Sequence, residues 1–142
     1  MKTSYEPILF DTNVLIYAYD LDAGAKHNAA AARVRDIWER RYGVTSTQVL
    51  QEFYVNVTGK IPTPLSQAGA WGVLQSYFSW QIEWNGPDTI LLASEIEERH
   101  RIAFWDAMIV AAAIRGGAER ILTEDLNHGQ VIEGVQIHNP FL

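Results

Sequence analysis

The sequence predicts an α/β fold built on a central, mainly parallel sheet. Short apolar segments of strand character alternate with helical segments along the chain, which is typical of a parallel sheet covered by helices on both faces. The first strand, residues 8–10, is apolar throughout, as a central strand of such a sheet should be. The chain has 142 residues and contains no linker or repeat, so we expect one domain spanning 1–142.

The segments between turn signals give the order of the elements. The sheet should contain about five strands, at residues 8–10, 44–46, 81–84, 120–123 and 135–138. Helices should occupy about 12–19, 26–41, 47–58, a segment capped by Ser66 that runs to about Phe78, 89–101 and 106–115. The last of these helices is apolar on almost every side, so we expect it to be buried.

Composition narrows the classes of function. The net charge is −6, whereas proteins that hold nucleic acid by neutralising many phosphates are usually basic, so any such contact should be local. The absence of cysteine excludes disulfides and thiolate zinc sites and fits a cytoplasmic location. No apolar run approaches the roughly 20 residues of a membrane span, and the polar N-terminus is unlike a signal peptide, so no membrane contact is expected.

Four acidic residues mark the ends of apolar segments. Asp11 and Asp125 follow strands, Asp106 opens the apolar helix, and Glu52 lies in a helix that follows a strand. Ligands of parallel α/β folds bind beyond the carboxyl ends of the strands, which is where Asp11 and Asp125 should lie. Each acid also has an ordinary explanation, as a helix cap for Asp11 and Asp106, a solvated helix position for Glu52 and a polar turn for Asp125.

Converged carboxylates need a compensating charge. Two carboxylates about 4 Å apart repel by roughly 4 kcal/mol at an effective dielectric of 20, and several such pairs would strain a marginally stable domain. A divalent cation removes this repulsion, and an all-oxygen ligand set favours Mg²⁺ or Mn²⁺ over zinc. The four histidines show no ligand-like spacing. We therefore expect a metal site for phosphate chemistry, formed by Asp11, Glu52, Asp106 and Asp125.

Four segments of the chain together match one known family: Phe10–Tyr17, Gln51–Tyr54, Trp105–Ala113 and Ile121–Gly129. They resemble the PIN domain, most closely the VapC-type toxin ribonucleases of prokaryotic toxin–antitoxin pairs, and they follow the family's order across almost the whole chain. The resemblance implies a three-layer α/β/α sandwich and a metal-dependent endoribonuclease. Its main metal-binding and catalytic positions match Asp11, Glu52 and Asp106, its more variable acidic position matches Asp125, and its supporting polar positions match Thr12, Asn13 and Thr123.

The resemblance also implies a mechanism and partners. The reaction would be hydrolysis of RNA by metal-activated water, with Glu52 or Asp125 positioning that water or taking its proton. The implied partners are a cognate antitoxin and a second copy of the chain. For RNA contacts, the candidates are Trp105, which could stack on a base, and the arginines of the helix 26–41, Arg33, Arg35, Arg40 and Arg41. A solvated helix face is the alternative for the arginines.

Other classes fit the residues less well. A phosphoacceptor receiver domain needs a lysine at a late strand end, but the last lysine of the chain is Lys60. A phosphatase with an aspartate nucleophile needs an acid two residues further on, where Asn13 stands. The alternatives within the family are a nuclease of RNA processing outside a toxin–antitoxin pair, a DNA-cutting nuclease and a non-catalytic binding module. The last would have lost an acidic residue, and no acidic position is missing.

Overall fold

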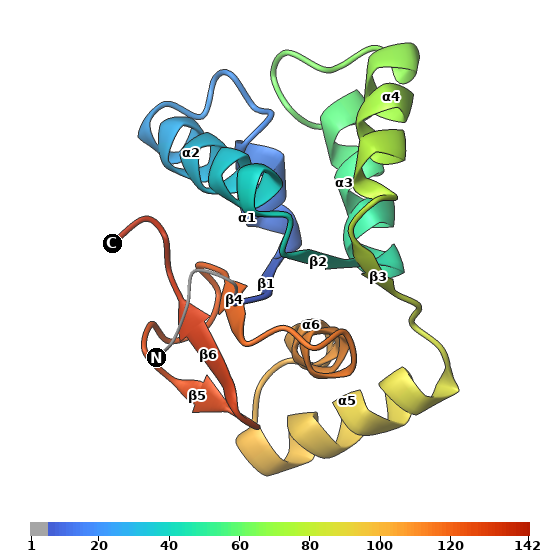
Figure 1. The fold of residues 1–142 in the computed structure, drawn as a ribbon, viewed down its shortest axis with the longest axis vertical. Helices are drawn as coiled ribbons and strands as arrows, with labels where there is room; N and C mark the ends of the chain where they lie inside the picture. The colour runs from blue at the N-terminus through green and yellow to red at the C-terminus, as the bar shows by residue number, and fades with distance from the viewer. Residues whose placement is uncertain (1–5) are drawn as a thin grey trace.

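The computed structural model describes residues 6–142 and contains a six-stranded sheet in the order β3-β2-β1-β4-β6-β5 (Figure 1). The strands are β1 (Ile8–Phe10), β2 (Gly43–Ser46), β3 (Gln81–Glu83), β4 (Arg120–Leu122), β5 (Val131–Ile132) and β6 (Val135–His138). Every neighbouring pair is parallel except β5 with β6. The predicted α/β class is therefore confirmed, and the sheet has one more strand than the five expected from the sequence.

The helices lie close to their predicted positions. They are α1 (Thr12–Tyr17), α2 (Ala25–Arg40), α3 (Thr47–Gly59), α4 (Gln67–Tyr77), α5 (Pro87–His100) and α6 (Phe104–Arg115). Ser66 caps α4 as predicted, because its hydroxyl accepts the backbone N–H of Gly69. α5 begins earlier than predicted, because Pro87 already has the φ angle of a first helical turn.

The helices form one layer on each side of the sheet (Figure 1). α6 packs against β2, β3, β4 and β6, and α5 covers its outer side. α1 and α3 pack together over the other side, where α2 contacts α1 and α4 contacts α3. This arrangement is the three-layer α/β/α sandwich that the resemblance implied.

Small residues bring α6 close to the sheet. All positions of α6 from Ala107 to Ala113 are buried, as its apolar sequence predicted. Just beyond this helix, a Cβ atom on Gly116 would lie 2.7 Å from the Cγ1 atom of Val44 in β2, a distance that no real side chain adopts. A glycine at this position therefore lets the end of α6 approach the start of β2.

The registers of β1 and β4 set up the carboxyl edge of the sheet. Phe10 pairs with Leu122, so the residues that follow, Asp11 and Thr123, emerge side by side at this edge. The backbone N–H of Asp11 continues the ladder by donating to the carbonyl of Leu122 at 2.9 Å. Within residues 6–142, no helix has both the length and the apolar character needed to cross a membrane.

Candidate metal centre

Asp11 is the buried carboxylate of the site. It ends β1 and caps α1, and only 8% of its surface is exposed. Its Oδ1 accepts the backbone N–H of Thr12 at 2.7 Å, and its Oδ2 accepts the hydroxyl of Thr123 at 2.7 Å. Burial nevertheless raises the pKa of Asp11 to about 6, and the charges of Asp125 and Asp106 act in the same direction. The sequence reading of Asp11 as a helix cap is therefore correct, and the residue also belongs to the acidic group.

Asp106 and Asp125 complete a group of three carboxylates. One oxygen from each of Asp11, Asp106 and Asp125 lies within 4.8 Å of the others. Asp106 lies in the first turn of α6, and Asp125 lies in the turn after β4, where its backbone N–H donates to the Thr123 hydroxyl at 3.1 Å. Partial burial raises the pKa of Asp106, and the charge of Asp125 raises it further. We name these three residues the acidic triad.

The structure corrects the burial expected for Asp106. The sequence pattern placed Asp106 at the start of a buried helix, but α6 begins at Phe104 and Ala103 occupies the cap position. Asp106 therefore lies two residues after the first residue of the helix and is not a helix cap. Its side chain is half-buried. The full cost of burying a carboxylate falls on Asp11 instead.

Glu52 lies beside the triad and outside it. Its Oε1 accepts a hydrogen bond from the hydroxyl of Thr12 at 2.8 Å, which ties α3 to the residue directly after Asp11. The side chain is exposed, and it is not among the three carboxylates whose oxygens lie within 4.8 Å of one another. Glu52 therefore lies next to the triad, but its carboxylate is not one of the three that group together.

A cavity of about 180 Å³ opens over these side chains. We name it the acidic cavity; its walls are Asp11, Thr12, Asn13, Gln48, Glu52, Asn56, Trp105, Asp106, Ile109 and Asp125. Gln48 and Asn56 were not predicted from the sequence, although their spacing of four residues from Glu52 puts all three on one face of α3. No lysine, arginine or histidine is among these lining residues, so the negative charge has no cationic partner at the cavity wall.

The supporting positions named from the sequence also lie here. Thr12 and Thr123 are buried and hold Glu52 and Asp11 through their hydroxyl groups, as described above. Asn13 is exposed and lines the cavity. Trp105, which was expected to contact RNA, is 64% exposed and lines the cavity as well.

Arg40 and Arg41, which were predicted as candidates for RNA contacts, do not line the acidic cavity. They stand at the C-terminal end of α2, directly before β2, and therefore at the amino edge of the parallel sheet. The guanidinium of Arg40 pairs with Asp36 at 3.1 Å. Arg41 lines a different cavity, described below. A helix that leads into a parallel strand ends opposite the carboxyl edge, where the acidic triad lies.

The comparisons with known proteins agree with this geometry. The model of the PIN domain matches residues 8–133, which is most of the chain. The chain belongs to the PIN domain family. No curated protein sequence matches this PIN domain significantly.

Solved structures share the fold of this PIN domain at low sequence identity. A toxin–antitoxin complex from Klebsiella pneumoniae matches with a TM-score of 0.66 and 20% identity, over 94% of this chain and 97% of the other. DNA-bound VapBC from Salmonella typhimurium gives 0.64 and 16%, over 95% and 98%. Mycobacterium tuberculosis VapC20, described as a toxin that cleaves the sarcin–ricin loop, gives 0.59 and 19%, over 80% and 86%.

The donor set of this PIN domain suits a hard divalent cation. The triad offers only carboxylate oxygens, which Mg²⁺ and Mn²⁺ accept and which zinc or copper sites rarely use alone. Burial and, to a smaller extent, the neighbouring carboxylates raise the pKa of Asp11 and of Asp106, so the ionised forms of both are disfavoured here. A bound cation would offset both the repulsion and the desolvation of these groups.

Proposed function

We propose that this PIN domain is an endoribonuclease that depends on Mg²⁺ or Mn²⁺. The observation that carries the proposal is the acidic triad, three carboxylates from distant segments whose oxygens lie within 4.8 Å of one another. Such a group is unfavourable without a cation, and a divalent cation next to an open cavity is suited to phosphodiester hydrolysis. Membership of the PIN family supports the proposal from a separate direction.

The acidic residues of the cavity would have two different roles, metal binding and activation of water. Asp11, Asp106 and Asp125 would hold the metal, which when bound makes water more acidic and neutralises phosphate oxygens. Glu52 lies outside the triad, and the Thr12 hydroxyl holds its carboxylate in place through Oε1. Because Glu52 is not needed as a metal ligand, it could position the attacking water or accept its proton. Asp125, exposed at the edge of the triad, is the alternative base.

Neutral side chains complete the site. Asn13, Gln48 and Asn56 line the cavity and can hydrogen-bond the sugar and phosphate oxygens without adding charge. Trp105 presents an exposed indole at the cavity, where a base of a single strand can stack on it. These contacts would orient RNA beside Glu52 and the triad, and they replace the arginines of α2 as substrate candidates.

We further propose that the chain is the toxin of a toxin–antitoxin pair. The solved structures of similar fold are described as toxins or toxin–antitoxin complexes, and two of them match over more than nine-tenths of both chains. The cleaved RNA would then be one that translation requires, and a cognate antitoxin would hold the toxin inactive. A cytoplasmic location belongs to the same proposal, because the RNA and the antitoxin would be present in the cytoplasm. A homodimer is also part of this proposal.

The catalytic proposal is tested by cleavage of labelled RNA with the purified full chain. Cleavage should require Mg²⁺ or Mn²⁺, and Asp106→Asn should lower its rate by at least about 100-fold, because several kcal/mol of transition-state stabilisation are lost. Asp88→Asn is the matched control, since Asp88 is an exposed acid in the first turn of α5. Equal rates in the two variants would contradict the assignment of the site.

The toxin role needs a separate experiment. Expression of the wild-type chain alone should arrest growth, and co-expression of a small protein encoded beside it should restore growth. Cleavage in vitro without arrest in the cell would instead favour a nuclease of RNA processing. The two experiments therefore distinguish a failure of the chemistry from a failure of the biological role.

A further inference from the structure

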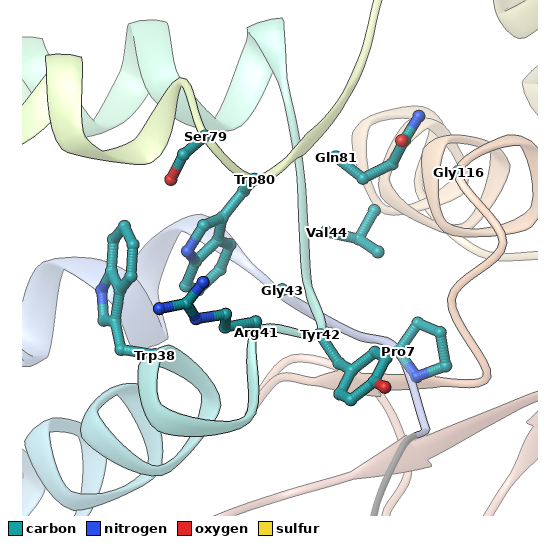
Figure 2. A pocket seen from close by; sticks show the side chains of 10 residues that line it. All are labelled: Pro7, Trp38, Arg41, Tyr42, Gly43, Val44, Ser79, Trp80, Gln81 and Gly116. Atoms are coloured by element: carbon teal, nitrogen blue, oxygen red, sulfur yellow. The ribbon is translucent and has the colours of Figure 1, made fainter.

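A second and larger cavity lies at the opposite edge of the sheet (Figure 2). Its volume is about 630 Å³, within the range of roughly 300–1,000 Å³ that is usual for ligand sites. Gly43 and Val44, which begin β2, lie between a row formed by Pro7, Arg41 and Tyr42 and a row formed by Ser79, Trp80 and Gln81. We name it the amino-edge cavity, because the acidic triad lies where the same strands end.

The wall of the amino-edge cavity is a fixed aromatic surface. The ring centroids of Trp38 and Trp80 are 5.2 Å apart, and each ring also packs on Tyr77, at 5.1 and 4.7 Å. The indole of Trp80 lies so close to the backbone of Gly43 that a Cβ atom there would fall 2.3 Å from the ring. Glycine at this position therefore allows the strand to support the indole. Trp80 is 8% exposed and Tyr77 is fully buried, so the half-buried indole of Trp38 is the part of this surface that a flat aromatic group can reach.

The charge of this cavity is opposite to that of the acidic cavity. Arg41 is its only lysine or arginine, and no aspartate or glutamate lines it. In Figure 2 the guanidinium of Arg41 extends toward the two indoles. No carboxylate within residues 6–142 pairs with this guanidinium, although the chain carries a net charge of −6. The guanidinium is therefore available to an external anion, which it can hold through two parallel hydrogen bonds.

Two polar groups of the wall also lack side-chain hydrogen bonds within residues 6–142. The indole Nε1 of Trp80 is buried without a hydrogen-bond partner in the described part of the chain, which is rare for an indole N–H. The amide of Gln81 is exposed, but in Figure 2 it points away from the two indoles, on the other side of Val44. Arg41 is therefore the polar group that a ligand beside the indoles can reach.

We propose that the amino-edge cavity binds a nucleoside monophosphate, either free or as the 5′-phosphorylated end of a nucleic-acid strand. The base would lie against the indole of Trp38, and the phosphate would pair with Arg41, whose guanidinium lies beside that indole in Figure 2. A wholly apolar ligand would leave Arg41 unused, and a metal ion would find no carboxylate among the lining residues. This site is separate from the acidic cavity and does not depend on the function proposed for it.

Binding can be observed at the indole N–H signals of the isotopically labelled full chain. The chain contains five tryptophans, and single Trp→Phe variants assign their signals. Adenosine and guanosine monophosphates should shift the signals of Trp38 and Trp80 with saturation and leave those of Trp71 and Trp105 in place. The titration is carried out in EDTA and repeated with Asp11→Asn, so that the acidic cavity does not contribute. A 5′-phosphorylated trinucleotide, compared with the free nucleotide, tells the two sources apart.

Arg41→Gln should weaken binding by about 10-fold or more, because a charge-assisted hydrogen bond is lost. Arg101→Gln is the matched control: both arginines are exposed, both end a helix in the left-handed conformation, with φ of 64° and 54°, and their N–H groups bond the carbonyl four residues back. The control should bind within about twofold of wild type. Adenosine without phosphate and inorganic phosphate alone should both bind more weakly than the nucleotide. Absence of a saturable shift at millimolar nucleotide, or equal binding by the two variants, would overturn the proposal.

Discussion

The hydroxyl of Thr123 donates a 2.7 Å hydrogen bond to Oδ2 of Asp11, although the two residues are 112 positions apart in the chain. The hydroxyl oxygen of Thr123 also accepts the backbone N–H of Asp125 at 3.1 Å. One buried side chain thus sets the positions of two members of the acidic triad. It does so because β1 and β4 are neighbours that end in register.

Replacing Thr123 therefore tests how the triad is held. Thr123→Val keeps the shape of the side chain but removes the hydroxyl, so the buried carboxylate of Asp11 loses a donor and its pKa should rise further. We expect a loss of about 1–3 kcal/mol in unfolding free energy at neutral pH, and weaker metal-dependent cleavage. Thr123→Ser restores the hydroxyl and should recover most of both. Denaturant unfolding and RNA cleavage measure the two effects, and identical behaviour of the valine and serine variants would refute the role of the hydrogen bond.

The buried carboxylate of Asp11 predicts an unusual dependence of stability on pH. Its pKa in the folded protein is about 6, raised from an ordinary value of 3.8, so the folded state binds this proton more tightly than the unfolded state. The resulting stabilisation is complete below the unfolded pKa and is lost as the pH rises through the folded one. In the metal-free protein at neutral pH, ionised Asp11 should therefore cost about 3 kcal/mol.

Asp11→Asn removes this cost. In EDTA at neutral pH, the variant should be more stable than the wild type, and the difference should shrink as the pH falls toward about 4. Denaturant unfolding across that pH range measures it. The same variant should lose metal-dependent cleavage, so stability and activity would change in opposite directions. A wild-type protein that is as stable as Asp11→Asn at every pH would show that ionisation of Asp11 does not lower the free energy of unfolding.

Much of the site follows from rules that act on short stretches of sequence. Asp11 and Asp125 could be placed because a residue just after a buried parallel strand lies at the carboxyl edge. The position of Arg41 could also have been predicted, since a helix leading directly into a parallel strand ends at the amino edge. Its positive charge suggested an RNA contact at the carboxyl edge instead. The burial of Asp106 could not be predicted, because it depends on whether the helix begins at Phe104 or two residues later.

Other features depend on tertiary contacts that no local pattern reveals. β5 has only two residues, too few to show the alternation of a strand. Gln48 and Asn56 look like solvated helix positions until α1 and α6 bring the triad beside them. The strand expected over residues 81–84 ends at Glu83, so Trp84 lies in the loop between β3 and α5 and is 76% exposed.

The position of Glu52, which is hydrogen-bonded to Thr12 outside the triad, allows metal binding and catalysis to be tested separately. Because Glu52 lies outside the triad, Glu52→Gln should reduce cleavage strongly, by about 100-fold, while it lowers Mn²⁺ affinity less than Asp106→Asn does. Thr12→Val frees the Glu52 side chain from its 2.8 Å hydrogen bond and should give a smaller loss of rate. Calorimetric Mn²⁺ titrations and single-turnover cleavage measure the two quantities. If Glu52→Gln abolishes metal binding as completely as Asp106→Asn, Glu52 is a fourth ligand.

The exposed indole of Trp105 predicts a contribution to RNA binding alone. Trp105→Ala should raise the KM for RNA by about 10-fold, as expected when one base loses its stacking surface, with a small effect on stability. Trp71 is a suitable control because it is 60% exposed and does not line the acidic cavity. Steady-state cleavage of a short RNA measures both variants, and an equal KM for the two would remove Trp105 from the substrate site.

Metal titration of the melting temperature tests the central claim most directly, because it needs no substrate. Mg²⁺ or Mn²⁺ should raise the melting temperature of the wild type and of Asp88→Asn, since a ligand at about 100 times its Kd adds about 2.7 kcal/mol of stability. The rise should be absent in Asp106→Asn and in Asp11→Asn, whatever their stability without metal. An equal rise in the wild type and in both triad variants, or no rise in the wild type at millimolar metal, would contradict a metal site built from Asp11, Asp106 and Asp125.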